Sequence, residues 1–403
     1  MLEYPQRVLI NIAQRGHTGR VTSYRKIELS LTSPIQQKSE IFNLEKPIKV
    51  SSCILPGLVV SNEKKTCQDS YSYILSHNML LCALFDGHGP VGEKISGHAS
   101  AYIVNYFLSN IQKFIENTKE SLIMMLEECD KALENTKINY TLSGTTAVVL
   151  LLTSSSIHTA SLGDSRAVLG TIAEMSFSLP APSNKYCRTW TVNRVLKPIP
   201  LTVDQKPNHE EEFLRIRQAG GCVEKVKDLL GNGIGPYRVW LADQDLPGLA
   251  MSRSIGDKVA KGVGVIATPV YHYFTIYHET DQYIVMASDG IWDVFENMEV
   301  INFIEKFKDK CEDCIIEDSY PASFKNSNIA RLLCEEARYR WFALVEAEDV
   351  HIDDISCIII DISARSNEKL VAKKERNVKA FQSLALPNEY KVKEDPLKLE
   401  SED

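Results

Sequence analysis

Five aspartates stand where short apolar runs of the sequence begin or end. They are Asp69, Asp86, Asp164, Asp289 and Asp353. Each alone is typical of a turn or a helix cap, because the short Asp side chain bonds to nearby backbone amides. A carboxylate at the end of a buried strand needs a partner, since an unpaired charge beside an apolar core is costly. If the five converge, their hard oxygen atoms suit Mg²⁺ or Mn²⁺ rather than zinc.

Short apolar runs lead into these aspartates and predict the strands that position them. The run 79–85 stops at Asp86, and the run 282–287 stops just before Asp289. A capping-box pattern at Asn208 predicts a further helix start. Strands in groups, separated by blocks of helices, indicate packed antiparallel sheets with helical layers outside, an α+β architecture. Four longer stretches have helix-like patterns: 93–117, 120–134, 298–307 and 328–344.

The charge of the chain is unevenly distributed. There are 45 Lys and Arg against 53 Asp and Glu, a net charge of −8. Residues 51–364 alone carry −13, because the balance is +4 over residues 1–50 and +1 over residues 365–403. So acidic a centre repels a phosphate backbone and favours metal cations, so no nucleic-acid partner is expected. The longest apolar runs fall far short of the roughly 18–20 residues of a membrane span, so none is expected.

Cysteine usage and the chain ends indicate a cellular location. The ten cysteines are scattered, which is typical of reduced thiols in an intracellular protein. The close pair Cys311 and Cys314 lacks the second pair that a structural zinc site needs. Leu2 stands where myristoylation requires glycine. We expect a monomer in the cytoplasm or nucleus.

Eight short motifs follow one another along residues 56–362. They are Asp86-Gly87-His88-Gly89, Ser143-Gly144-Thr145-Thr146-Ala147, Gly163-Asp164-Ser165-Arg166-Ala167, Leu201-Thr202-Val203-Asp204-Gln205-Lys206-Pro207, Ala219-Gly220-Gly221, Ser252-Arg253-Ser254-Ile255-Gly256-Asp257, Ser288-Asp289-Gly290-Ile291-Trp292-Asp293 and Asp353-Asp354-Ile355-Ser356. Any one of them is a weak pattern. All eight in this order resemble the metal-dependent protein serine/threonine phosphatases, the protein phosphatase type 2C family.

The resemblance implies a fold and a division of the chain. It implies a central sandwich of two antiparallel β-sheets flanked on both outer faces by antiparallel α-helices, a four-layer αββα arrangement with the active site at one end. It also implies an N-terminal extension over residues 1–55, a catalytic domain over residues 56–364 and a charged tail over residues 365–403. The basic residues before position 50 suit either an extended arm that contacts a partner or a weakly ordered or edge-strand extension.

The resemblance also assigns roles to individual residues. It implies two Mg²⁺ or Mn²⁺ ions held by Asp69, Asp86 with the backbone carbonyl of Gly87, Asp289 and Asp353. Asp164 and Asp293 resemble the residues that hold a weaker third ion in some members. His88 stands at the position of the proposed general acid, or else it only orients a ligand carboxylate.

Three positions depart from the family pattern. Gln68 replaces a common Glu, which lowers the local negative charge. Lys64, or less favourably Lys65, stands where some members have an arginine that grips the phosphate. Asp354 replaces a common Asn and adds a negative charge that is either solvated or tunes the centre. Residues 222–237 are glycine-rich and fall where the family has a flap beside the active site, so they form either that flap or a disordered connection.

The predicted activity is hydrolysis of phosphoserine and phosphothreonine in proteins. A two-metal centre suits it, because two ions both activate water and neutralise the phosphoryl oxygens. A cysteine phosphatase is not expected, since the only Cys-x5-Arg spacing, Cys334 to Arg340, lies in a helical pattern without glycine. A catalytically dead scaffold would be expected to lose the metal carboxylates, which are all present here. Hydrolysis of a small phosphoester stays an alternative, because it would use the same centre.

Overall fold

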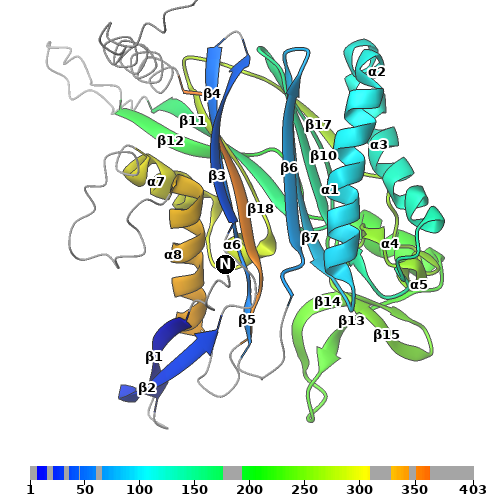
Figure 1. Ribbon diagram of the computed structural model, residues 1–403. Helices are drawn as coiled ribbons and strands as arrows, with labels where there is room; N and C mark the ends of the chain where they lie inside the picture. Colours follow the sequence, from blue (N-terminus) through cyan, green and yellow to red (C-terminus); the bar gives the residue numbers. More distant parts are fainter. Residues whose placement is uncertain are drawn as a thin grey trace, which may run out of the picture.

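The computed structural model describes most of the chain (Figure 1). The described residues are 7–15, 21–30, 36–44, 46–59, 66–175, 193–308, 328–344 and 351–363. Three of the predictions above concern residues outside these ranges: the phosphate-binding Lys64 or Lys65, the pair Cys311 and Cys314, and the tail 365–403.

One sheet of seven strands has the order β16-β8-β7-β9-β10-β17, with β6 paired to the other side of β7. Its strands are β6 (Asp69–Ser76), β7 (Met79–His88), β8 (Gly144–Thr145), β9 (Ala147–Leu152), β10 (Ser156–Leu162), β16 (Ile255–Gly256) and β17 (Val270–Thr275). Every pairing in it is antiparallel.

The second sheet has six strands in the order β12-β11-β18-β20-β4-β3 and is also antiparallel. Its strands are β3 (Gln36–Leu44), β4 (Lys46–Leu55), β11 (Arg166–Met175), β12 (Asn193–Pro200), β18 (Asp281–Ala287) and β20 (Ile355–Asp361). Strands β3 and β4 come from the stretch predicted as an N-terminal extension, and β4 pairs with β20 over seven residues. The chain before residue 56 therefore supplies two strands of this sheet.

The two sheets face each other, and helices cover both outer faces (Figure 1). Strand β7 shows why its sequence is continuously apolar: Leu81, Ala83 and Phe85 pack with the helices of one face, while Leu80 and Leu84 pack between the sheets. The helices on that face are α1 (Gly92–Ser109), α2 (Ile111–Glu116) and α3 (Thr118–Ala132), followed by a short 3₁₀ turn (Leu133–Asn135). On the other face lie α7 (Asn297–Phe307) and α8 (Ile329–Leu344). The predicted four-layer αββα sandwich is confirmed.

The remaining helices and strands of the described chain complete the structure. They are β1 (Arg7–Arg15), β2 (Val21–Ser30), β5 (Leu58–Val59), β13 (Cys222–Lys227), β14 (Gly233–Leu241), β15 (Gln244–Leu249), β19 (His351–Ile352), α4 (Glu210–Gln218), α5 (Lys258–Lys261) and α6 (Asp289–Trp292). Within the described ranges, no helix combines the length and apolarity needed to cross a membrane.

The glycine-rich stretch 222–237 is more regular than its composition suggests. Strands β13 and β14 pair over it, and β15 completes a three-stranded antiparallel sheet. The expectation of an irregular or disordered stretch was wrong, because Gly231 has φ 83° in the tight connection and lets the chain reverse. The tip carries Leu229 and Leu230, which are both exposed.

Two helix boundaries differ from the sequence predictions. The expected helix over 93–117 is interrupted at Asn110, whose backbone and side-chain N–H groups both donate to the carbonyl of Tyr106, at 3.0 and 2.9 Å. Helix α4 begins at Glu210 after His209, and no capping bond from the His209 side chain is found in the described structure. The predicted box at Asn208 is therefore wrong, and the acidic residues of the first turn favour the helix start instead.

Candidate metal centre

The first pair of predicted ligands is brought together by the register of two strands. Asp69 opens β6 and lies directly opposite Asp86 near the end of β7. Directly opposed residues of antiparallel strands have Cβ atoms about 5 Å apart. Strand register therefore places two carboxylates side by side, where they repel each other.

The second sheet brings the other predicted ligands to the same end of the sandwich. Strand β18 pairs with β11 on one side and β20 on the other, with Ala287 opposite both Arg166 and Cys357. Asp289 follows β18 and opens α6, and Asp353 precedes β20. Gly290 keeps these segments in contact, because a Cβ there would lie 2.2 Å from the Asp354 carbonyl oxygen.

Hydrogen bonds tie the two sheets together at this end. The Asp86 N–H donates to Thr146 Oγ1 at 3.0 Å, and that hydroxyl lies 2.7 Å from Ser165 Oγ in the turn that holds Asp164. The Gln68 N–H donates to Asp354 Oδ2 at 2.9 Å. The strand ends that carry the aspartates are thus fixed relative to one another.

Some carboxylate oxygens of this cluster are buried and have no hydrogen-bond partner in the described structure. Asp69 is 6% exposed, and among the described residues neither of its side-chain oxygens has a hydrogen-bond partner. Asp289 Oδ1 is likewise buried and unpartnered within the described structure. These oxygens are free to bind a cation.

The electrostatics of the cluster agree with this interpretation. Burial, followed by the charge of Asp354, raises the pKa of Asp69 to about 8. Burial and then the charges of Asp69 and Asp289 raise the pKa of Asp86 well above its usual range. Burial, then Asp164 and Asp353, do the same to the pKa of Asp289. Without a counter-ion, these carboxylates favour holding protons over carrying charge.

The donor set fits hard divalent ions, although it is not a ready-made cage. All the clustered donors are oxygens, which suits Mg²⁺ or Mn²⁺. In the described part of the chain, no three His, Cys, Asp or Glu side chains already stand at metal-binding spacing. The cluster supplies buried, unpartnered oxygens, and side-chain adjustment would have to complete the coordination.

Asp164 and Asp293, predicted for a third ion, lie in different surroundings. Asp164 is 4% exposed, and one of its oxygens accepts a hydrogen bond from the Lys206 ammonium. Asp293 ends α6 and is exposed. Partial removal of its carboxyl group from water raises the pKa of Asp293, while the charge of Lys206 opposes that shift. The Lys206 ammonium therefore already balances the charge of Asp164 on this side of the cluster.

His88 is held by an aspartate that sequence analysis gave no role. His88 Nε2 lies 2.7 Å from Asp257 Oδ2, and Asp257 is 2% exposed. Asp257 also accepts a bond of 2.6 Å from Ser254 Oγ. Burial acts to lower the pKa of His88, but the charge and hydrogen bond of Asp257 outweigh it, so that pKa is raised. The imidazole is thus oriented and kept readily protonated, two residues from Asp86.

Comparison with known proteins decides the family. Residues 78–340 match the family described as Protein phosphatase 2C. The chain belongs to the protein phosphatase 2C family. It is 34% identical over 254 residues to "Probable protein phosphatase 2C 65" of Arabidopsis thaliana, an alignment that spans 57% of this chain and 59% of the relative. It is 29% identical over 335 residues to "Probable protein phosphatase 2C 72" of the same plant, covering 80% of this chain and 88% of the relative.

A solved structure supports the fold of this protein phosphatase 2C member. The crystal structure of serine-threonine phosphatase 2C from Toxoplasma gondii superposes with a TM-score of 0.56 at 16% identity, covering 89% of this chain and 99% of that one. The resemblance inferred from the eight motifs is therefore confirmed. Asp69 and Asp353 lie just outside the matched range 78–340, at strand ends that the sheets bring to the cluster.

Asp354, which departs from the family pattern, has a structural role. It is 3% exposed, and its two oxygens accept the N–H groups of Gly57 at 2.5 Å and Gln68 at 2.9 Å. Of the two alternatives for this charge, the solvated carboxylate is wrong, because two backbone donors hold it inside. Burial is the main cause of the raised pKa of Asp69, and the charge of Asp354 adds to it. Gln68 in turn donates from Nε2 to the Gly89 carbonyl at 2.7 Å. This bond joins the segment before β6 to the loop after β7.

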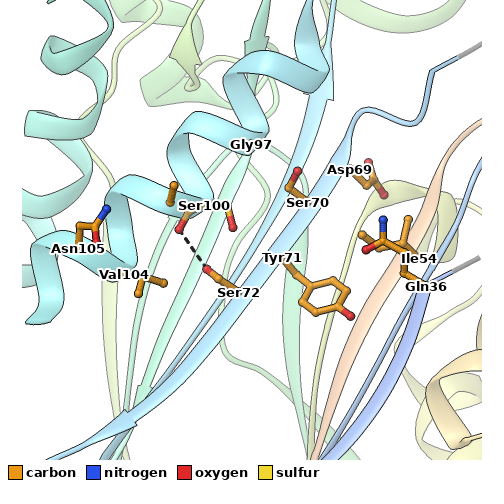
Figure 2. Close-up of a pocket in the computed structure, with 11 residues that line it drawn as sticks. Gln36, Ile54, Asp69, Ser70, Tyr71, Ser72, Gly97, Ser100, Val104 and Asn105 are labelled. Carbon is orange, nitrogen blue, oxygen red and sulfur yellow. Dashed lines mark hydrogen bonds between the residues drawn. The ribbon is translucent and has the colours of Figure 1, made fainter. Parts of the chain in front are cut away.

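A cavity of about 510 Å³ lies beside the cluster. Figure 2 shows its wall, in which β6 contributes Asp69, Ser70 and Ser72 and α1 contributes Ser100. The Ser72 hydroxyl donates to the Ser100 carbonyl at 3.3 Å. Asp69 is the one predicted site residue in this wall, so the cavity adjoins the cluster without being its centre.

Sequence reasoning missed the partners of the predicted residues rather than the residues themselves. Asp257 and Lys206 both stand in motifs quoted above, but a motif does not show which side chain faces which. The sequence did contain one indication of the role of Lys206. It is a basic residue of the Leu201–Pro207 motif, in a chain with six aspartates predicted to bind metal ions.

Proposed function

We propose that this chain is an Mg²⁺- or Mn²⁺-dependent protein serine/threonine phosphatase that hydrolyses phosphoserine and phosphothreonine by direct attack of water. The observation that carries the proposal is the gathering of aspartates, with buried unpartnered oxygens, at one end of a protein phosphatase 2C fold. The proposal includes a monomeric protein of the cytoplasm or nucleus whose partners are phosphoproteins.

Asp69, Asp86, Asp289 and Asp353, with the carbonyl of Gly87, would hold two ions. When bound, such ions supply a water of lowered pKa and neutralise charge on the phosphoryl oxygens. Gly87 suits this role because its backbone is closely packed: a Cβ there would lie 2.6 Å from the carbonyl oxygens of both Gln68 and Gly92. Any side chain at this position would displace the strand end that carries Asp86.

His88 would donate the proton that the leaving serine or threonine oxygen needs. An alkoxide is a poor leaving group, so protonation lowers the barrier most for alkyl phosphates. Asp257 favours this role because it binds Nε2 and favours the protonated ring, leaving Nδ1 as the nitrogen that can donate. Nδ1 is buried and has no partner among the described residues.

The test is release of phosphate from a phosphothreonine peptide with Mn²⁺, with Mg²⁺ and with excess EDTA. The wild type is compared with Asp289→Asn, which keeps the shape of the side chain and removes its charge. We expect turnover that requires the ion and is lost in the variant. Absence of turnover from a folded wild type with either ion would refute the proposal and favour a scaffold that binds partners through the same fold.

A second substrate separates the two enzymatic alternatives. Comparable turnover of the phosphopeptide and of a small alkyl phosphate would favour a small-molecule phosphatase. We expect the phosphopeptide to be turned over faster, because the exposed three-stranded sheet β13-β14-β15 offers contact surface that a small ester does not use.

A further inference from the structure

The Leu201–Pro207 motif runs beside the turn that holds Asp164. The Leu201 N–H donates to the Ala167 carbonyl and the Gln205 N–H to the Gly163 carbonyl, both at 2.8 Å. These two bonds bracket the turn between β10 and β11. The motif is therefore fixed in register with Asp164.

Side chains of the same motif reinforce that placement. Asp204 accepts two bonds from the Arg166 guanidinium, at 2.9 and 2.7 Å. Arg166 also donates to Asn297 Oδ1 at 2.8 Å and lies over the Trp292 ring, 5.2 Å from its centroid. The motif, the turn and the helix that begins at Asp289 therefore form one connected unit.

Lys206 projects from this unit toward the carboxylates. Its ammonium donates to Asp164 Oδ2, and its side chain is 30% exposed. A lysine ammonium carries its charge at neutral pH. Lys206 therefore places a cation among the residues predicted to hold a third ion.

We propose that the Lys206 ammonium is a built-in counter-cation on the Asp164 and Asp293 side of the centre, where it competes with a third divalent ion. This inference rests on the proposed function. Two cations that share a carboxylate repel each other, and Lys206 already uses one oxygen of Asp164. Asp164 Oδ1 has no partner in the described structure, so the carboxylate can accept a divalent ion once the ammonium is removed.

Direct binding of Mn²⁺ to the full-length metal-free chain tests this inference. Free Mn²⁺ is measured by electron paramagnetic resonance during titration of the wild type, Lys206→Met and Lys206→Arg. Met removes the charge at similar length, while Arg keeps it. We expect Lys206→Met to bind one more ion than the wild type, and Lys206→Arg to match the wild type.

Two further variants control the result. Lys113→Met removes an exposed lysine of α2 and should leave the binding curve unchanged. Asp164→Asn in the Lys206→Met background should reverse the gain. Asp164→Asn alone should leave the wild-type curve unchanged, because Lys206 already excludes the ion from that carboxylate. This variant keeps the test informative even where Lys206→Met folds poorly.

The outcomes distinguish this inference from the function on which it rests. If the wild type binds two ions and Lys206→Met gives the same curve, the role of Lys206 is refuted and the metal dependence stands. If Asp164→Asn alone loses an ion that the wild type holds, Lys206 does not exclude it and the inference is again wrong. If neither the wild type nor Lys206→Met binds Mn²⁺ at millimolar concentration, the metal dependence is refuted and this inference falls with it.

Discussion

Replacing Asp86 by Asn should make the metal-free protein more stable while abolishing metal-dependent turnover. Asp86 faces Asp69 across two strands, and the pKa of each carboxyl is raised by burial and by neighbouring carboxylates. The asparagine keeps the shape and removes one charge. Most substitutions destabilise a protein, so a gain in stability would be a specific signature of crowded charge.

The magnitude follows from the register and the pKa shift. Two charges about 5 Å apart at an effective dielectric constant near 20 repel by about 3 kcal/mol. Asp69 can avoid this repulsion by holding a proton in the folded protein, where its pKa is raised from 3.8 to about 8. Taking up that proton at pH 7 costs about 4 kcal/mol relative to the ionised unfolded state. Part of that shift comes from burial and from the charges of Asp354 and Asp353, none of which Asp86→Asn changes. We therefore expect the free energy of unfolding to rise by about 1–3 kcal/mol.

The sign of the pH dependence provides a second check. An acid whose pKa is raised by folding stabilises the native state below its unfolded pKa and loses that contribution as pH rises through its folded pKa. The metal-free wild type should therefore lose stability between about pH 4 and pH 8. Asp86→Asn should lose less over the same range, and the two proteins should converge near pH 4.

The assay is urea unfolding in EDTA and in Mn²⁺, with Asp281→Asn as a matched control. Asp281 is also a buried aspartate, but it stands at the start of β18 and accepts the Tyr277 N–H at 2.8 Å. Its loss should destabilise the protein by about 1–3 kcal/mol in either condition. Mn²⁺ at 100 times its dissociation constant should stabilise the wild type by about 2.7 kcal/mol and Asp86→Asn by much less. The charge-crowding argument is refuted if Asp86→Asn destabilises the metal-free protein as Asp281→Asn does.

Two further predictions concern side chains that the structure pairs closely. His88→Ala should lower turnover of an alkyl phosphate by about 10²–10⁴-fold and that of an aryl phosphate little, and Asp257→Asn should show the same selectivity; equal losses on both substrates would exclude a proton-donor role. Glu212 is 5% exposed, and its pKa of about 2 reflects bonds from Arg215 and Arg253 that outweigh burial. A carboxyl pKa lowered by folding stabilises the native state above its unfolded value, so Glu212→Gln should cost up to about 3 kcal/mol at pH 7 and about 2 kcal/mol at pH 3.5. If urea titrations give the same loss of stability for Glu212→Gln at pH 7 and at pH 3.5, the charge of Glu212 is not what Arg215 and Arg253 bind.

The sequence was most informative where local pattern and burial agree. The apolar run 79–85 predicted a strand, and β7 is buried on both faces, so every residue of the run packs against a helix or the opposite sheet. Aspartates at strand ends left their convergence open, and the resemblance of the eight motifs to the family predicted it. The strand inference required no knowledge of distant contacts.

The sequence was least informative where long-range contacts decide. Glycine-rich composition over 222–237 indicated irregular chain, yet pairing with β15 orders it as a sheet. Asn110 ends a helix within one amphipathic pattern because α2 packs back, with Phe114 stacked edge-on to Phe107 at 5.0 Å. Asp354 looked like surplus charge until its two backbone donors, 286 and 297 positions away, were placed beside it. The local structural propensities of a sequence cannot show which distant residues become partners.

Hydrogen bonding separates two kinds of buried aspartate that the motifs place side by side. Asp257 and Asp354 each accept bonds from protein donors that satisfy their charge, so they can orient neighbours without a cation. Asp69 and Asp289 retain buried oxygens without partners among the described residues, and evolution of a merely stable fold would have supplied donors or apolar side chains there. Under the proposed function, a bound cation would satisfy these unpaired oxygens. Asp164 lies between the two kinds, with one oxygen bound by Lys206 and one left over, which is why Lys206 is the residue whose removal should change the number of ions bound.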